Sequence, residues 1–60
     1  MGEKLRAVRQ AAGMTQAQLA AAVGCTQKDV CRWETEEREP KARTLKKLAQ
    51  ALGCSMDDLV

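Results

Sequence analysis

Histidine, phenylalanine and tyrosine are absent from this chain of 60 residues, and tryptophan and proline occur once each. Without histidine, acid–base catalysis by an imidazole is excluded. The lack of Phe and Tyr, together with few β-branched residues, argues against a β-sandwich or a barrel. No apolar run approaches the roughly 20 residues that span a bilayer, and no stretch reads as a signal peptide. The sequence therefore predicts neither a membrane protein nor a β-rich fold.

Three cysteines are an odd number, so a closed disulfide framework cannot use all of them. Cys25, Cys31 and Cys54 lack the paired C-x-x-C spacing of structural zinc sites. Cys25 and Cys54 fall at apolar positions, where cysteine behaves as a small hydrophobic residue. No nucleophile, base and orienting group form a set, so the sequence predicts no enzyme. We expect reduced thiols in a cytoplasmic protein that holds no metal and no cofactor.

Ala, Leu, Gln, Lys, Arg and Glu dominate the composition, and these residues lose little conformational freedom on entering a helix. The composition therefore predicts an all-α domain. Net charge is only +2, but the charges are unevenly placed. Residues 1–33 carry five basic and two acidic side chains, whereas residues 34–60 carry five basic and six acidic ones. The positive excess in the first half hints at a polyanionic partner.

Glycines and N-capping residues divide the chain into short helical segments. The first segment carries apolar residues at helical spacing and ends at a glycine. The second, residues 16–23, follows Thr15, whose capping-box partner Gln18 stands three residues on, and it ends at Gly24. The third follows Thr26, which is a second N-cap candidate.

Two further segments follow residues 35–39, a loop without apolar side chains. Pro40 suits the first turn of the fourth helix, because its missing N–H would have no partner there. An apolar stripe then continues to a glycine, and Ser55 with Asp58 caps a fifth segment. The sequence predicts one domain, residues 1–60, built as a compact bundle of five short helices.

Residues 16–35 predict a helix-turn-helix motif, because only Gly24, Cys25 and Thr26 separate the second and third segments. Two helices that cross at a steep angle need a small side chain where their backbones approach, and Ala20 provides it. Gly24 supplies the left-handed residue of the turn.

The residues around this motif resemble the Cro/phage-repressor helix-turn-helix family of bacterial and phage DNA-binding regulators. The resemblance covers nearly the whole chain and is carried by Leu5–Arg9, Gly13–Gln16, Leu19–Ala20, Val23–Gln27, Val30, Arg32–Glu34, Pro40, Thr44–Leu45, Leu48–Ala49, Ala51–Gly53 and Leu59. It implies sequence-specific binding of double-stranded DNA by a transcriptional regulator, a repressor rather than an activator. It also implies a homodimer on DNA, with the third helix of each copy in the major groove.

The resemblance places base-reading side chains at Gln27, Lys28 and Arg32. An amide can donate and accept at once, which matches adenine N6 and N7, and a guanidinium can hold guanine O6 and N7. Whether Lys28 and Arg32 meet bases or phosphates stays open at this point. An ordinary solvated helix face is the alternative for all three residues.

Contacts to the DNA backbone, or the orientation of other side chains, are implied for Thr15, Gln16, Thr26, Arg38 and Lys41. The threonines would cap helices whose free N–H groups hold phosphate oxygens. The amide of Gln16 would orient Gln27 and reach a phosphate. Arg9 and Glu34 look like the family's internal ion pair, which holds the third helix in place. Trp33, on the same face as the apolar residues of its helix, is interpreted as core.

The loop after the third segment departs from the family. Where many members have Gly two residues after Glu34, this chain has Glu36, and Glu37 and Glu39 follow where basic residues are common. These carboxylates oppose a strong grip on phosphates and leave the conformation of the loop open. They also favour an alternative function, a protein-interaction module such as an antitoxin-like domain that binds a partner protein.

Overall fold

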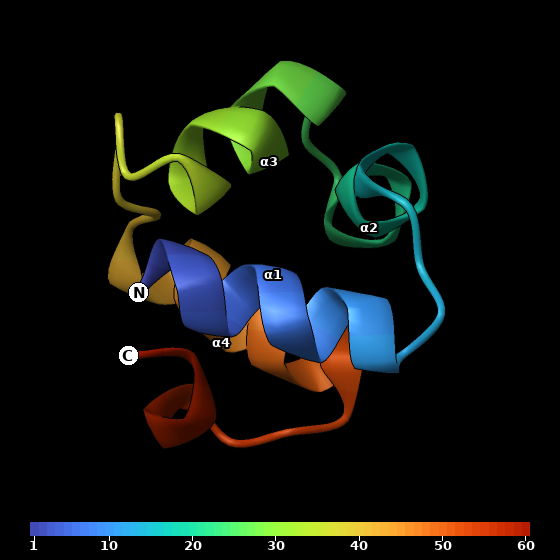
Figure 1. Cartoon of the computed structure of the whole chain (residues 1–60), viewed down its shortest axis with the longest axis vertical. Helices are drawn as coiled ribbons and strands as arrows, with labels where there is room; N and C mark the ends of the chain where they lie inside the picture. Colours follow the sequence, from blue (N-terminus) through green and yellow to red (C-terminus); the bar gives the residue numbers. More distant parts are fainter.

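Four α-helices and one short 3₁₀ turn make up the fold (Figure 1). The computed structural model describes residues 1–60. The helices are α1 (Gly2–Ala11), α2 (Gln16–Val23), α3 (Gln27–Glu34) and α4 (Ala42–Leu52), and the 3₁₀ turn is η1 (Met56–Leu59). The predicted all-α class is confirmed, since the chain has no strand.

The predicted count of five helices is wrong, because the last segment is a 3₁₀ turn and not an α-helix. Its cap was predicted correctly, since Asp58 accepts a hydrogen bond from the backbone N–H of Ser55 at 3.1 Å. The turn comprises the four residues Met56–Leu59, and 3₁₀ geometry is common in pieces of this length.

The placement of Pro40 also needs correction. The sequence places it in the first turn of α4, but the helix begins at Ala42, with Lys41 as its N-cap. Lys41 has an extended backbone, with a ψ of 159°, and its side chain makes no capping hydrogen bond. The proline therefore lies one residue before the cap, and it directs the chain into the helix without being part of it.

Both helices of the motif begin and end where the sequence predicts. Thr15 closes a capping box, in which the N–H of Gln18 donates to Thr15 Oγ1 at 3.1 Å. Thr26 does the same for α3, with the N–H of Asp29 donating to its hydroxyl at 3.2 Å. Between the two helices Gly24 has a φ of 75°, a conformation that side-chain-bearing residues rarely adopt.

The core draws one fully enclosed side chain from each element: Leu5, Leu19, Val30, Leu48 and Leu59. Ala20 and Ala49 are also buried, and Trp33 joins them with 8% of its surface exposed. In Figure 1, α1 lies in front of α4. The helix α3 lies above this pair, and α2 lies above the pair and to the right. Because every element contributes to one core, α2 and α3 are held by the rest of the bundle as well as by each other. None of the helices has the length and hydropathy needed to cross a bilayer.

The loop after α3 keeps a glycine-like conformation at a residue that is not glycine. Glu36 has a φ of 63° and is the one non-glycine residue with positive φ. The surroundings of Glu36 are tight, because a Cβ at the neighbouring Gly2 would clash with the carbonyl oxygen of Glu34 and with Cγ of Glu36. The start of α1 thus packs against the backbone at the end of α3, and the chain must turn sharply there. The left-handed conformation common to glycine is retained, at a steric cost to Glu36.

Replacing Glu36 with Gly should therefore stabilise the fold. Glycine accepts positive φ without steric cost, so we expect the free energy of unfolding to rise by about 0.5–1 kcal/mol. Urea unfolding followed by circular dichroism measures this change. Glu37→Gly is the control for the conformation, because it removes a carboxylate from the adjacent residue, whose φ is not positive. Glu36 differs in lying 3.5 Å from the N-terminal ammonium of Met1, a pair that contributes little to stability because the Glu36 side chain is exposed. Glu37→Gly should destabilise the fold, and equal effects of the two substitutions would contradict the steric explanation.

Candidate nucleic-acid interface

The outer face of α3 carries polar side chains with no partner inside the protein. Gln27, Lys28 and Cys31 are exposed and Arg32 is partly exposed. None of these four side chains donates or accepts a hydrogen bond within the chain, and none forms an ion pair. Val30, on the opposite side of the helix, is fully buried and holds α3 on the core. The three predicted base-reading residues thus lie on one solvated face of a fixed helix.

Cys31 is a member of this face that the sequence analysis did not include among the contact residues. It lies four residues after Gln27 and three after Lys28, so its side chain stands beside both on the helix surface. Its position in the helical period predicts partial exposure on the flank of the third helix, and the structure shows it exposed. Cysteine is only a weak hydrogen-bond donor and acceptor, so its residue type gives no signal of a contact role.

The starts of α2 and α3 offer backbone donors. The hydroxyls of Thr15 and Thr26 are engaged by their own capping boxes. The backbone N–H groups of the first two residues of each helix have no acceptor in the chain. Such groups point along the helix axis, and the helix dipole adds a positive potential, so each end can hold an anion.

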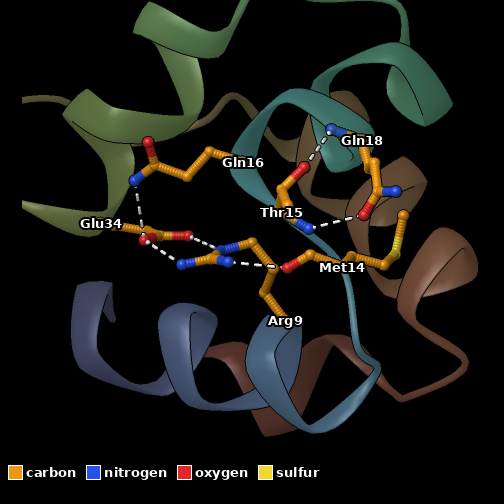
Figure 2. Close-up of polar contacts among 6 residues, drawn as sticks. All are labelled: Arg9, Met14, Thr15, Gln16, Gln18 and Glu34. Atoms are coloured by element: carbon orange, nitrogen blue, oxygen red, sulfur yellow. Dashed lines mark hydrogen bonds and ion pairs between the residues drawn. The ribbon is translucent and has the colours of Figure 1, made fainter.

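Arg9 and Glu34 form a nearly buried ion pair that joins α1 to the end of α3 (Figure 2). Arg9 Nε donates to Glu34 Oε2 at 2.6 Å, and Nη2 donates to Oε1 at 3.1 Å. The third nitrogen, Nη1, donates to the carbonyl oxygen of Met14 at 2.7 Å. Only 10% of the Arg9 side chain and 4% of the Glu34 side chain are exposed. One guanidinium therefore fixes both the end of α3 and the loop before α2.

The structure does not show the predicted contact between Gln16 and Gln27. Gln16 Nε2 instead donates to Glu34 Oε1 at 3.1 Å, as Figure 2 shows. The buried carboxylate of Glu34 has acceptor capacity beyond what Arg9 fills, and Gln16 at the start of α2 lies close enough to satisfy it. Gln16 therefore belongs to the same network as Arg9, and Gln27 remains free.

The charge of Glu34 is stabilised by its donors despite its burial. Burial raises the pKa of the Glu34 carboxyl, but the hydrogen bonds from Arg9 and Gln16 and the charges of Arg9 and Arg6 outweigh this effect, so the pKa lies below its ordinary value. The hydrogen bond to Glu34 raises the pKa of Arg9 against the opposing effect of burial. Both groups are therefore ionised at neutral pH.

The loop between α3 and α4 mixes charges of both signs. Arg38 and Lys41 are exposed, and so are Glu36, Glu37 and Glu39 around them. No ion pair joins the acidic and basic side chains of this loop to one another. The two predicted phosphate contacts are therefore available, but carboxylates stand directly beside them.

The three cysteines are free thiols, with Cys31 exposed and the other two half-buried. Burial, with a smaller effect of the Asp29 charge, raises the pKa of the Cys25 thiol. Burial and the Asp58 charge do the same for Cys54. Both thiols are thus protonated at neutral pH, which suits a packing role. No group of three or more Cys, Asp or Glu side chains is arranged to hold a metal ion.

Comparison with known proteins shows that the resemblance extends over the whole domain. The helix-turn-helix family profile matches residues 5–59. Repressor protein C2 of Salmonella phage P22 is 40% identical over 60 residues, which are 100% of this chain and 28% of that protein. A prophage-derived uncharacterised helix-turn-helix-type transcriptional regulator of Bacillus subtilis (strain 168), YonR, is 36% identical over 59 residues, 98% of this chain and 55% of that protein. The chain thus spans only part of the length of these relatives.

Two solved structures share the fold closely. One is a crystal structure of the P22 c2 repressor in complex with a synthetic operator, with a TM-score of 0.93 and 39% identity. The match covers 98% of this chain and 89% of that one. The other is the solution structure of the DNA-binding domain of the same repressor, with a TM-score of 0.92, 40% identity, and coverage of 97% and 76%. The arrangement of α2 and α3 described above is therefore that of a protein solved on its operator.

Replacing Glu34 with Gln should destabilise the fold, because it leaves the Arg9 charge nearly buried without a counter-ion. We expect the free energy of unfolding at neutral pH to fall by about 3 kcal/mol, measured by urea unfolding. Glu39→Gln, which removes an exposed carboxylate without an ion pair, is the matched control and should have little effect.

The same variant should lose part of its pH dependence. The folded-state pKa of Glu34 lies below its ordinary value of 4.5, so the ionised carboxylate stabilises the parent fully above about pH 4.5. This contribution is lost as the pH falls through the folded-state pKa. The stability curves of parent and variant should therefore converge on acidification. Parallel curves down to about pH 3 would show that Glu34 is not the group that titrates.

Proposed function

Because the chain belongs to the helix-turn-helix family, we propose that it binds double-stranded DNA of defined sequence and regulates transcription as a repressor. The observation that carries this proposal is the close match to a repressor solved on its operator, combined with a solvated and unpartnered polar face on α3. In such complexes the second helix of the motif enters the major groove and the first lies across the backbone. A promoter occupied in this way excludes the polymerase.

Base reading is assigned to Gln27, Lys28 and Arg32. All three side chains are free of internal hydrogen bonds and ion pairs, so none has to break such a contact before it meets a base edge. The amide of Gln27 matches adenine, and Arg32 matches guanine through two parallel hydrogen bonds. Lys28 stands one turn from Arg32 and can reach guanine or the adjoining phosphate.

Backbone contacts are assigned to Thr15, Gln16, Thr26, Arg38 and Lys41. The two threonines act indirectly, by fixing helix starts whose free N–H groups meet phosphate oxygens. Gln16 keeps its second amide hydrogen for a phosphate while the first stays on Glu34. Arg38 and Lys41 supply positive charge from the loop and from the start of α4.

A single domain of 60 residues offers few contacts, so we propose a homodimer on two half-sites about one helical turn apart. Residues 1–60 act as one DNA-binding domain in the cytoplasm, and this activity requires no cofactor, metal or catalytic residue. Met56 and Val60 are the large apolar residues left exposed, and both lie near the C-terminus, where a second copy can cover them.

Substitution of the reading face should separate specific from non-specific binding. In Gln27→Ala and Arg32→Ala, we expect the affinity for the preferred site to fall by about 1–3 kcal/mol, because base contacts are lost. Affinity for random duplex should change much less, because phosphate contacts remain. Fluorescence anisotropy with both duplexes measures the difference. Equal losses on both duplexes would show that these side chains contact only phosphates.

Salt dependence should report the backbone contacts. With about three to five phosphate contacts per copy, log K should fall with log salt with a slope of about −3 to −5 per half-site. Lys41→Ala should flatten the slope by about one and leave the preferred sequence unchanged. Lys46→Ala, an exposed lysine on α4 outside the proposed contact set, is the control and should leave the slope unchanged.

The alternative function is a protein-interaction domain, and the exposed acidic residues 36, 37 and 39 are the observation that favours it. Selection from a random pool of duplexes separates the two functions. Recovery of a common sequence supports DNA binding. Two results together would replace DNA binding with this alternative. The protein binds no duplex at low salt, and it captures one partner protein with the wild-type loop but not with a loop that carries three Glu→Gln substitutions.

A further inference from the structure

A groove of about 300 Å³ lies between the turn of the helix-turn-helix motif, the side of α3 and the start of α4. Its lining includes Cys25 and Trp33 and three basic side chains, Arg38, Lys41 and Lys47. The acidic residues Asp29 and Glu39 also border it. Trp33 is the single aromatic residue of the protein and is mostly buried, so its exposed part belongs to a fixed wall. The groove is thus a separate feature from the outer face of α3.

The three basic side chains of this groove lack partners inside the protein. Arg38, Lys41 and Lys47 make no side-chain hydrogen bond and no ion pair, even though two carboxylates line the same groove. The indole N–H of Trp33 has no acceptor within the protein and is not fully buried. It is therefore open to solvent. Three cationic side chains around one groove favour a ligand that supplies acceptors.

We propose that this groove binds a small organic anion, a phosphate or carboxylate group carried on a flat apolar body. The guanidinium of Arg38 and the ammonium groups of Lys41 and Lys47 provide charge-assisted hydrogen bonds to the anionic group. The side chains of Trp33 and Cys25 provide an apolar wall for the body of the ligand. The volume is at the lower end of the range for ligand sites, which limits the ligand to about one ring with its anionic group.

The same anionic chemistry is present in the DNA backbone, so the two sources have to be separated. A phosphate on a rigid duplex approaches as part of a polyanion, and Asp29 and Glu39 repel an anion from either source. A small anion enters singly, and the two carboxylates can accept hydrogen bonds from its hydroxyl or amino groups. Arg38 and Lys41 are also assigned to backbone contacts, so a free ligand in the groove and the DNA backbone would compete for these two side chains.

Titration of ¹⁵N-labelled full chain with phenyl phosphate tests this proposal without DNA. Because the chain has one tryptophan, a single indole N–H signal reports the groove. We expect a saturable shift of that signal. Lys47→Ala should weaken the apparent affinity roughly three- to tenfold through the loss of one charge-assisted hydrogen bond. Lys46→Ala removes the same charge from the adjacent residue of α4, which does not line the groove, and should change the affinity by less than about twofold.

Three results would overturn the proposal. In the first, the indole signal does not move or shifts linearly without saturation. In the second, the two lysine variants weaken binding equally, which shows general charge attraction. In the third, the signal moves with a random duplex and not with phenyl phosphate. The last result would make the groove a backbone contact. Circular dichroism of both variants establishes that they are folded, so a loss of binding in Lys47→Ala is a property of the groove. Since no arm depends on sequence-specific DNA recognition, failure here leaves the proposed function standing.

Discussion

The guanidinium of Arg9 is the group on which the geometry of the motif depends. Its three nitrogens bind the Glu34 carboxylate at the end of α3 and the Met14 carbonyl before α2, and Gln16 completes the set from the start of α2. Hydrophobic contacts press α2 and α3 together but are non-directional, and they do not fix how far one helix slides along the other. Directional hydrogen bonds from a planar fork do fix it. The outer face of α3 is therefore held in one orientation by a polar network at its rear.

The polar residues of the motif divide into two groups with different tasks. Thr15, Thr26 and Gln16 are engaged in capping boxes or in the Arg9 network, so they define where helices begin and how they meet. Gln27 and Lys28 have no internal partner. A side chain that makes hydrogen bonds within the fold cannot be replaced without disturbing the fold. A side chain without internal partners can be replaced while the fold stays the same. The separation permits new binding specificity on an unchanged scaffold.

The sequence was most informative where local chemistry decides the structure. Both helices of the motif were bounded correctly, because Thr caps and a turn glycine act within a few residues. Prediction was weaker where distant contacts decide. The sequence predicts Pro40 inside α4 and a helix after Ser55, whereas α4 begins at Ala42 and the last segment is a 3₁₀ turn. The sequence predicts Gln27 as the partner of Gln16, whereas the partner is Glu34. No local pattern shows that the Glu34 carboxylate is buried with an unused acceptor. The groove at the start of α4 also depends on tertiary packing alone.

The small size of the domain makes the Arg9 network and folding inseparable. At about 0.05–0.15 kcal/mol per residue, 60 residues give a total stability of roughly 3–9 kcal/mol. The loss of one partner from a buried ion pair costs about 3–5 kcal/mol, which is comparable to this total. A nine-residue hydrophobic core has little in reserve to absorb such a loss. A variant with a disrupted network therefore loses a large part of the stability of the domain, so binding specificity changes at a lower cost on the outer face of α3.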